Sequence, residues 1–253
     1  MPIRVGFFAF LEDIGKQGDG FSNFGGPHLL MLAGLAVLTA ALCVLYAKLP
    51  KRRRAAMLKI LAFVIVGLEV AKQATFPLLH GQYWYFLLPL HFCGLSIAIE
   101  FVHAFWPNKT TGEILYCLCL PGAVMALLFS NWSMYTFNNF YCLQSFVIHA
   151  LHIAFPLSLL ITKEIVPDYK KLWRVVVFLA AVVPPIYLVN LRLGTNFFFI
   201  NAGSEGSPLE IFIQIAGVPG FLLLYAGLVA FVWILMYAPW VIAGRKGRNG
   251  KPA

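Results

Sequence analysis

The sequence predicts an all-α membrane protein, a single domain of seven transmembrane helices over residues 1–253. Two properties of the whole chain support this fold class. Of its residues, 60% are hydrophobic and only 11% are charged, a composition typical of proteins that reside in a bilayer. The apolar residues also gather in runs of about 20, the length that a helix needs to cross the hydrocarbon core. The segments between these runs are too short to fold a soluble core of their own.

Seven such runs follow one another along the chain. Their approximate ranges are 28–46, 57–79, 83–105, 113–129, 139–161, 172–191 and 211–240. Pro27 suits the start of the first helix, whereas Pro121-Gly122 and Pro184-Pro185 are expected to break the fourth and the sixth. The loop before the last run mixes polar residues with Phe197-Phe198-Phe199, so it either lies at the membrane interface or folds back over the helices.

Basic residues predict the orientation of these helices. With seven spans, only Arg4, Lys16 and Arg192 fall on one side, and the other basic residues outside the spans fall on the opposite side. Cytoplasmic loops carry the excess of Lys and Arg. We therefore expect the N-terminus outside and the C-terminus in the cytoplasm. Because orientation accounts for the net charge of +9, we expect no nucleic-acid partner.

Ionisable residues inside three of the predicted spans form the candidate site, since such residues mark either function or a specific packing contact. In the second span, Glu69 and Lys72 share one helix face with Gln73. One interpretation is an ion pair that neutralises itself and fastens two helices together. The other is a pair that lines a polar cavity, where it binds a head group or tunes a histidine.

In the fifth span, His149 and His152 follow Ser145 at intervals of four and three residues, which places all three on one stripe of the helix. Gln144 precedes this stripe. A histidine in a membrane either packs through a hydrogen bond or serves as a proton donor and acceptor. Both interpretations remain open here.

The third span carries Cys93, Glu100 and His103 on one face of a regular helix, while His91 points about 200° away from Cys93. His91 and Cys93 therefore cannot face the same cleft unless Pro89 distorts this turn. Glu100 and His103 are expected close to the cytoplasmic end of the span. There they reach interfacial water and need no special role.

Depth in the membrane groups the remaining candidates. Glu69, Lys72, His91 and His149 are all expected near mid-depth or in the outer half, where a histidine can move protons or activate a thiol. Three histidines are enough to hold a metal, but HxxxH, HExxH and DxD patterns are absent from the sequence, so we expect neither a metal nor another cofactor. His28, at the outer mouth of the first span, either caps that helix or contacts substrate.

Several short motifs, spread over nearly the whole chain, resemble the YwaF-like family of bacterial integral membrane proteins. They are Phe24-Gly-Gly-Pro-His28, Leu68-Glu69-Val-Ala-Lys72, Leu88-Pro-Leu-His91-Phe-Cys93, Leu120-Pro-Gly-Ala-Val, Leu143-Gln144 and Gly194-Thr-Asn196-Phe. That family is similar to a eukaryotic acyltransferase that moves polyunsaturated acyl chains onto ether phospholipids and for which a cysteine and a histidine are implicated. The resemblance implies a bacterial plasma membrane and, by analogy, a lipid-modifying role with membrane lipids as partners.

The leading hypothesis is an enzyme that transfers or hydrolyses lipid acyl chains inside the helix bundle. His149 is the expected general base, and Cys93, or a water held by His91, is the expected nucleophile. The expected substrate-binding residues are Glu69, Lys72, Gln144, His152, Asn196 and His28.

Two other classes of function fit the same residues. In a small-solute or proton-coupled transporter, Glu69, Lys72, His91 and His149 would form the site at mid-membrane. In a non-catalytic scaffold, these polar groups would only hold helices together.

Overall fold

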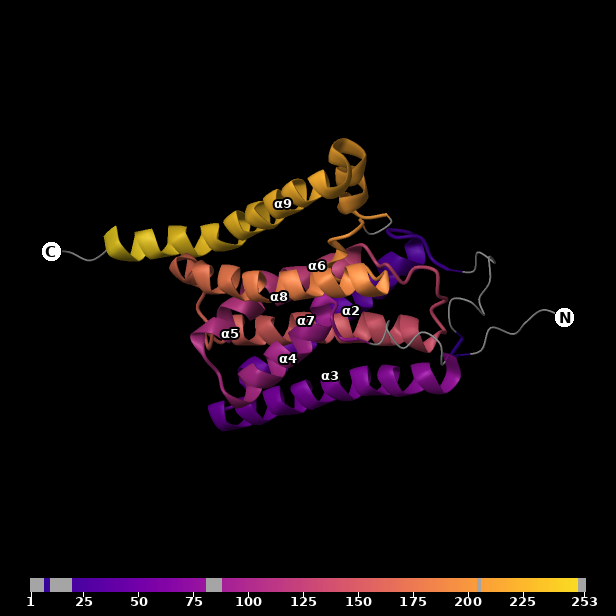
Figure 1. Cartoon of the computed structure of the whole chain (residues 1–253). Coiled ribbons are helices and arrows are strands. Elements are labelled where there is room, and N and C mark those ends of the chain that lie inside the picture. Colours follow the sequence, from indigo (N-terminus) through magenta and orange to yellow (C-terminus); the bar gives the residue numbers. More distant parts are fainter. Residues whose placement is uncertain (1–6, 10–19, 81–87, 204–205, 250–253) are drawn as a thin grey trace.

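The computed structural model describes residues 7–9, 20–80, 88–203 and 206–249, and within these ranges every regular element is helical (Figure 1). The main helices are α2 (Gly26–Lys48), α3 (Lys51–His80), α4 (Phe92–Phe105), α5 (Lys109–Ile114), α6 (Leu120–Leu128), α7 (Phe140–Ile161), α8 (Leu172–Leu193) and α9 (Pro208–Asn249). Three short segments join them, namely η2 (Leu115–Cys119), η3 (Tyr169–Lys171) and η4 (Phe197–Phe199). The all-α prediction is confirmed.

Five stretches of the described residues are long and apolar enough to cross a membrane. They are Gly26–Lys48, Lys109–Leu128, Phe140–Ile161, Tyr169–Leu193 and Pro208–Ile242. The second predicted span corresponds to α3, and the third to α4. Helix α4 is only 14 residues long because it begins at Phe92, and residues 83–87 of that predicted span lie outside the described part of the chain. The count of seven spans therefore remains a prediction.

Helix α7 forms the centre of the bundle and packs against α2, α3, α4 and α6 (Figure 1). In its most apolar window 67% of the residues are buried, against 11% for α8 and for α9. The Asn139 side chain starts α7, where its Oδ1 accepts hydrogen bonds from the backbone N–H groups of Tyr141 (2.8 Å) and Cys142 (3.3 Å). The residues of α7 are thus the best placed to meet side chains from several other helices.

The fourth predicted span is helical from Lys109 to Leu128 and the sixth from Leu172 to Leu193, so the breaks expected at Pro121-Gly122 and Pro184-Pro185 are wrong. In the fourth span, the five residues before α6 form a π-helical segment. There the N–H of Leu120 bonds to the carbonyl of Leu115, five residues earlier, whereas an α-helix would use the carbonyl four residues earlier. Pro121 has no N–H to give to the carbonyl of Cys117, four residues earlier. The indole N–H of Trp233 on α9 donates to that carbonyl instead, at 2.8 Å. A neighbouring helix thus satisfies the group that proline frees.

The two ends of the bundle differ in charge. At one end, here called the basic end, the α2–α3 turn meets the α7–α8 connection through Arg54 and Glu164 (3.3 Å), and Tyr46 donates to the same carboxylate (2.8 Å). The start of α5 lies at this end too. At the opposite end lie the start of α2, the start of α7 and the loop that precedes α9 (Figure 1).

Candidate functional site

Three of the predicted site residues meet where α3 faces α7. The Lys72 ammonium lies 2.7 Å from one oxygen of Glu69, and Gln73 donates to the other oxygen at 2.7 Å. Gln144 of α7 donates to Glu69 Oε2 over a longer 3.5 Å. The Lys72 and Glu69 side chains keep 31% and 13% of their surface exposed. Both carboxylate oxygens of Glu69 therefore have hydrogen-bonding partners, while part of each side chain remains exposed. We call this the open pair.

His91 and Cys93 both lie near this pair, in contrast to the expectation from a regular helix. The backbone of His91 is extended (φ −64°, ψ 154°), and α4 begins only at Phe92, so helical angles do not apply to His91. The chain doubles back tightly here, since a Cβ on Gly94 would overlap the carbonyl of Pro89. Lys72 interacts electrostatically with both His91 and Cys93. The turn before α4, rather than the helix, thus brings the two side chains to one place.

His149 of α7 completes what we call the Lys72 cluster: Glu69, Lys72, Gln73, His91, Cys93, Gln144 and His149. Its Nδ1 lies 2.6 Å from the backbone carbonyl of Ser145. Because a carbonyl only accepts, Nδ1 carries the proton, and Nε2 of the neutral ring keeps a lone pair. The ring stacks on Trp132, with centroids 5.0 Å apart, and it interacts electrostatically with Lys72 and His91. This imidazole is held in the form that acts as a base.

Cys93 differs from the other four cysteines of the chain. Cys43, Cys117, Cys119 and Cys142 are buried, whereas Cys93 is only half-buried. Within the described residues, no hydrogen bond joins the Cys93 thiol to a histidine. The same part of the chain contains no group of three or more His, Cys, Asp or Glu side chains arranged to hold a metal ion.

A second polar pair, Glu100 and His152, lies deeper in the bundle. His152 Nδ1 and Glu100 Oε2 are 2.9 Å apart, and the two side chains are 1% and 0% exposed. Glu100 Oε1 and His152 Nε2 have no hydrogen-bond partner among the described residues. The expectation that Glu100 reaches interfacial water is wrong, because α4 packs this face against α7. The sequence did contain a signal, since Glu100 shares a helix face with Cys93.

His152, predicted to bind substrate, is thus buried and hydrogen-bonded to Glu100. Its ring lies edge-on to that of His149, with centroids 5.9 Å apart. The Glu100–His152 pair therefore borders the Lys72 cluster without joining it by a direct hydrogen bond.

Two further predicted residues, His28 and Asn196, lie away from the cluster. His28 is fully buried: its Nδ1 accepts from Phe24 N (2.9 Å), and its Nε2 donates to Leu127 O (2.9 Å). Asn196 bonds only within its own loop, to the backbone of Asn201 and Ala202. Both side chains form hydrogen bonds that hold neighbouring backbone in place, and among the described residues neither forms a hydrogen bond with the Lys72 cluster.

Asn190 is a residue that sequence reasoning missed. Its amide N–H groups donate to Phe197 O (2.9 Å) and Asn201 Oδ1 (2.8 Å), and its oxygen accepts from Thr195 Oγ1 and Phe197 N (both 2.9 Å). These bonds fold the loop back over the helices. Phe197 then contacts the His91 ring, with centroids 5.0 Å apart. The sequence signal was an asparagine near the end of a predicted span, because an amide buried there needs hydrogen-bond partners.

The comparisons with known proteins agree with a helical membrane protein. The model of the TMEM164 family matches residues 23–237. No curated protein and no solved structure matches the chain. Since the family match covers most of the sequence, including every residue of the Lys72 cluster, the chain is a helical membrane protein that belongs to the TMEM164 family.

Proposed function

We propose that this protein is a membrane-embedded enzyme that transfers or hydrolyses the acyl chains of lipids. The observation that carries the proposal is the position of Cys93. It is the half-buried cysteine of the chain, and it lies beside the open Glu69–Lys72 pair. Lys72 acts electrostatically on this thiol, and the proposed reaction uses the thiolate, which is the nucleophilic form of cysteine. The resemblance to an acyltransferase, which rests on the motifs that contain these residues, points to the same chemistry.

Three residues of the Lys72 cluster act directly on the substrate in this reaction. The Cys93 sulfur attacks the ester carbonyl of the lipid, the thiol proton passes to His149 Nε2, and Lys72 faces the oxyanion that develops. The ester C–O bond breaks, the leaving oxygen takes the proton from His149, and a thioester remains on Cys93. An acceptor hydroxyl, or water, then attacks the thioester and gives its proton to His149, which returns it to the thiolate. Because Cys93 and His149 share no direct hydrogen bond, the proton travels through the substrate oxygen or one water.

Surrounding contacts support the remaining assignments. Glu69 orients Lys72 at 2.7 Å, and Gln144 fastens that carboxylate to α7. His91 holds the water for hydrolysis in the variant of this mechanism that uses no thiol. Phe197 and Phe199 pack on His91 and give the site an apolar side on which an acyl chain can lie.

Lipid mass spectrometry of membranes that contain matched amounts of each variant tests the proposal. Wild type should change the acyl composition of at least one lipid class, and Cys93→Ala and His149→Ala should abolish that change. Cys142→Ala is the matched control, because it removes a buried thiol from α7 and should leave the activity intact. Unchanged lipids in wild-type membranes would overturn the enzyme, and flux of solute or protons would then favour the transporter.

We also propose that α3 and α4 complete seven membrane crossings in the plasma membrane of a bacterium, with the N-terminus outside. The concentration of basic residues at one end of the bundle supports this orientation. Met134 at the opposite end and Lys163 at the basic end are both exposed. In a Cys93→Ala background, a membrane-impermeant maleimide should label Met134→Cys in intact cells and Lys163→Cys only after permeabilisation. The reverse pattern would overturn the orientation.

A further inference from the structure

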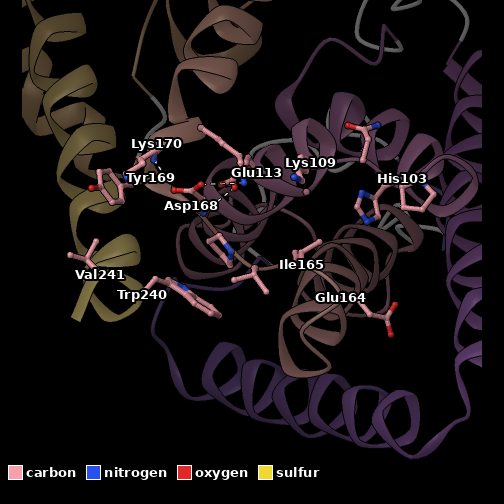
Figure 2. Close-up of a pocket in the computed structure, with 16 residues that line it drawn as sticks. His103, Lys109, Glu113, Glu164, Ile165, Asp168, Tyr169, Lys170, Trp240 and Val241 are labelled. Carbon is pink, nitrogen blue, oxygen red and sulfur yellow. Dashed lines mark hydrogen bonds and ion pairs between the residues drawn. The ribbon is translucent and has the colours of Figure 1, made fainter. Parts of the chain in front are cut away.

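A hollow of about 820 Å³ lies at the basic end, between α5, the α7–α8 connection and α9 (Figure 2). Its volume is in the range of small-molecule binding sites. In Figure 2, Trp240 and Val241 of α9 stand on one side of the hollow and His103 of α4 on the other. The hollow lies at the other end of the bundle from the start of α4, so it is separate from the Lys72 cluster.

The acidic side chains that line this hollow are all satisfied by partners within the protein. Glu113 accepts from the Tyr237 hydroxyl (2.6 Å) and from Asp168 N (3.0 Å). Asp168 binds the Lys171 ammonium (3.2 Å), and Glu164 binds Arg54 (3.3 Å). Their negative charges are therefore already balanced or hydrogen-bonded, and they offer little to a cation from outside.

Two lysines of the lining are left without such partners. Lys109, the first residue of α5, and Lys170, in η3, are exposed at the hollow, and neither makes an ion pair or side-chain hydrogen bond with any described residue. Arg174 adds a third cation next to the lining, where it donates to Thr110 Oγ1 at 3.1 Å. The charge that the hollow presents to a ligand is thus positive.

The same hollow also has an apolar side, formed by Val166, Trp240 and Val241. Val166 keeps 59% of its surface exposed, and Tyr169, which also lines the hollow, keeps 52%. Exposed aromatic and aliphatic side chains at the end of a transmembrane bundle are typical of the level of lipid head groups. Free ammonium groups beside an apolar wall match an amphiphile with an anionic head better than a soluble anion.

We propose that this hollow binds the phosphate group of an anionic phospholipid from the adjoining leaflet. Lys109 and Lys170 contact the phosphate, and the first carbons of the lipid rest against Val166 and Trp240. Lysine suits this role because it binds phosphate as a compact point charge with three donors. Binding at this site requires no reaction at Cys93, so the test of the lipid site does not depend on whether the proposed enzyme activity exists.

Lipid binding to the purified full-length chain tests the proposal. After removal of endogenous lipid, native mass spectrometry would measure binding of short-chain phosphatidylglycerol to wild type and to Lys109→Gln/Lys170→Gln. We expect the double variant to bind about 30-fold more weakly, from the typical contribution of each lysine near an anionic head group. The matched control is Lys51→Gln/Lys163→Asn, which removes two exposed lysines of the same end that do not line the hollow, and it should bind like wild type.

Three outcomes would overturn the proposal. Equal weakening in both double variants would mean general surface attraction rather than a site. Equal affinity for short-chain phosphatidylcholine would mean that the net negative charge of the head is not recognised. Displacement of the lipid by glycerol phosphate at the same concentration would assign the site to a soluble phosphate compound. Thermal unfolding of each variant checks that the exposed substitutions leave the fold intact.

Discussion

The Glu69–Lys72 and Glu100–His152 pairs each join a carboxyl group to a basic side chain, but in two different surroundings. Glu69 and Lys72 remain 13% and 31% exposed, and both carboxylate oxygens of Glu69 have partners. Glu100 and His152 are sealed at 0% and 1%, and each has an atom without a partner among the described residues. An open pair can exchange its partners for a substrate, whereas a sealed pair depends on its single contact. The first pair is therefore accessible, as the proposed reaction requires, whereas the second is buried between helices.

The largest effect is expected from breaking the sealed pair. Glu100→Ala leaves His152 buried without its partner, which typically costs about 3–5 kcal/mol of unfolding free energy. The double variant Glu100→Met/His152→Leu removes both polar groups and should recover much of that loss. Unfolding in detergent micelles measures both values. The single variants Glu100→Met and His152→Leu provide the reference. If the double variant loses as much unfolding free energy as these two variants lose together, the two residues do not act as a pair.

An intermediate effect is expected at Asn190, which holds the loop that packs on His91. Asn190→Ala strands buried backbone and side-chain groups of the loop, at about 1–3 kcal/mol for a stranded group. Because the loop packs on His91, alkylation of Cys93 should also become faster. Asn196→Ala is the control, since it loosens the far side of the loop and keeps Phe197 bonded to Asn190. Unchanged alkylation in Asn190→Ala would contradict the covering role.

A smaller effect on stability is expected at the open pair itself. Glu69→Gln keeps the size of the side chain and removes its charge, and because the pair is partly exposed the loss should stay below about 1 kcal/mol. The proposed lipid activity should nevertheless fall strongly, since Lys72 loses the carboxylate that orients it. A loss of stability as large as that of Glu100→Ala would erase the distinction between the two pairs.

The smallest effect is expected at Asp168 and Lys171, an ion pair at the surface of the basic end, with side chains 36% and 27% exposed. Slight burial raises the pKa of Asp168, but hydrogen bonds from Lys171 and from the Lys170 backbone, with the charges of both lysines, hold it below its ordinary value. A lowered pKa stabilises the fold at pH values above the ordinary pKa of about 4. That contribution is lost as the pH falls through the lowered value.

Unfolding of wild type and Asp168→Asn as a function of pH would measure this contribution. The variant should be slightly less stable at pH 7, and the two curves should converge in acid. A difference that grows in acid would contradict the assigned direction of the pKa shift.

Hydrophobic run length predicted the helices well, because crossing a bilayer fixes both their composition and their length. The contacts of the site were harder to predict. The separation of His91 from Cys93 assumed a regular helix through both, and the turn at Pro89 and Gly94 removes that assumption. Glu100 was expected to reach water because it lies near the end of a predicted span. Position along a span does not indicate which face of the helix a neighbour covers, and α7 covers this face. Asn190 lies in the sixth predicted span, and its position there does not indicate that one of its partners lies seven residues further on.

The carbonyl of Cys117, which Pro121 leaves free, has a further consequence for how this bundle is assembled. Helix α9 bonds to the fourth predicted span through the side chains of Trp233, Tyr237 and Trp240, and Trp233 donates to the carbonyl that Pro121 leaves without its helical partner. In lipid, where apolar surfaces have little preference for one another, a carbonyl without its helical partner gives a specific contact point for a neighbouring helix. The bond from Trp233 to this carbonyl therefore fixes the position of α9 along its neighbour.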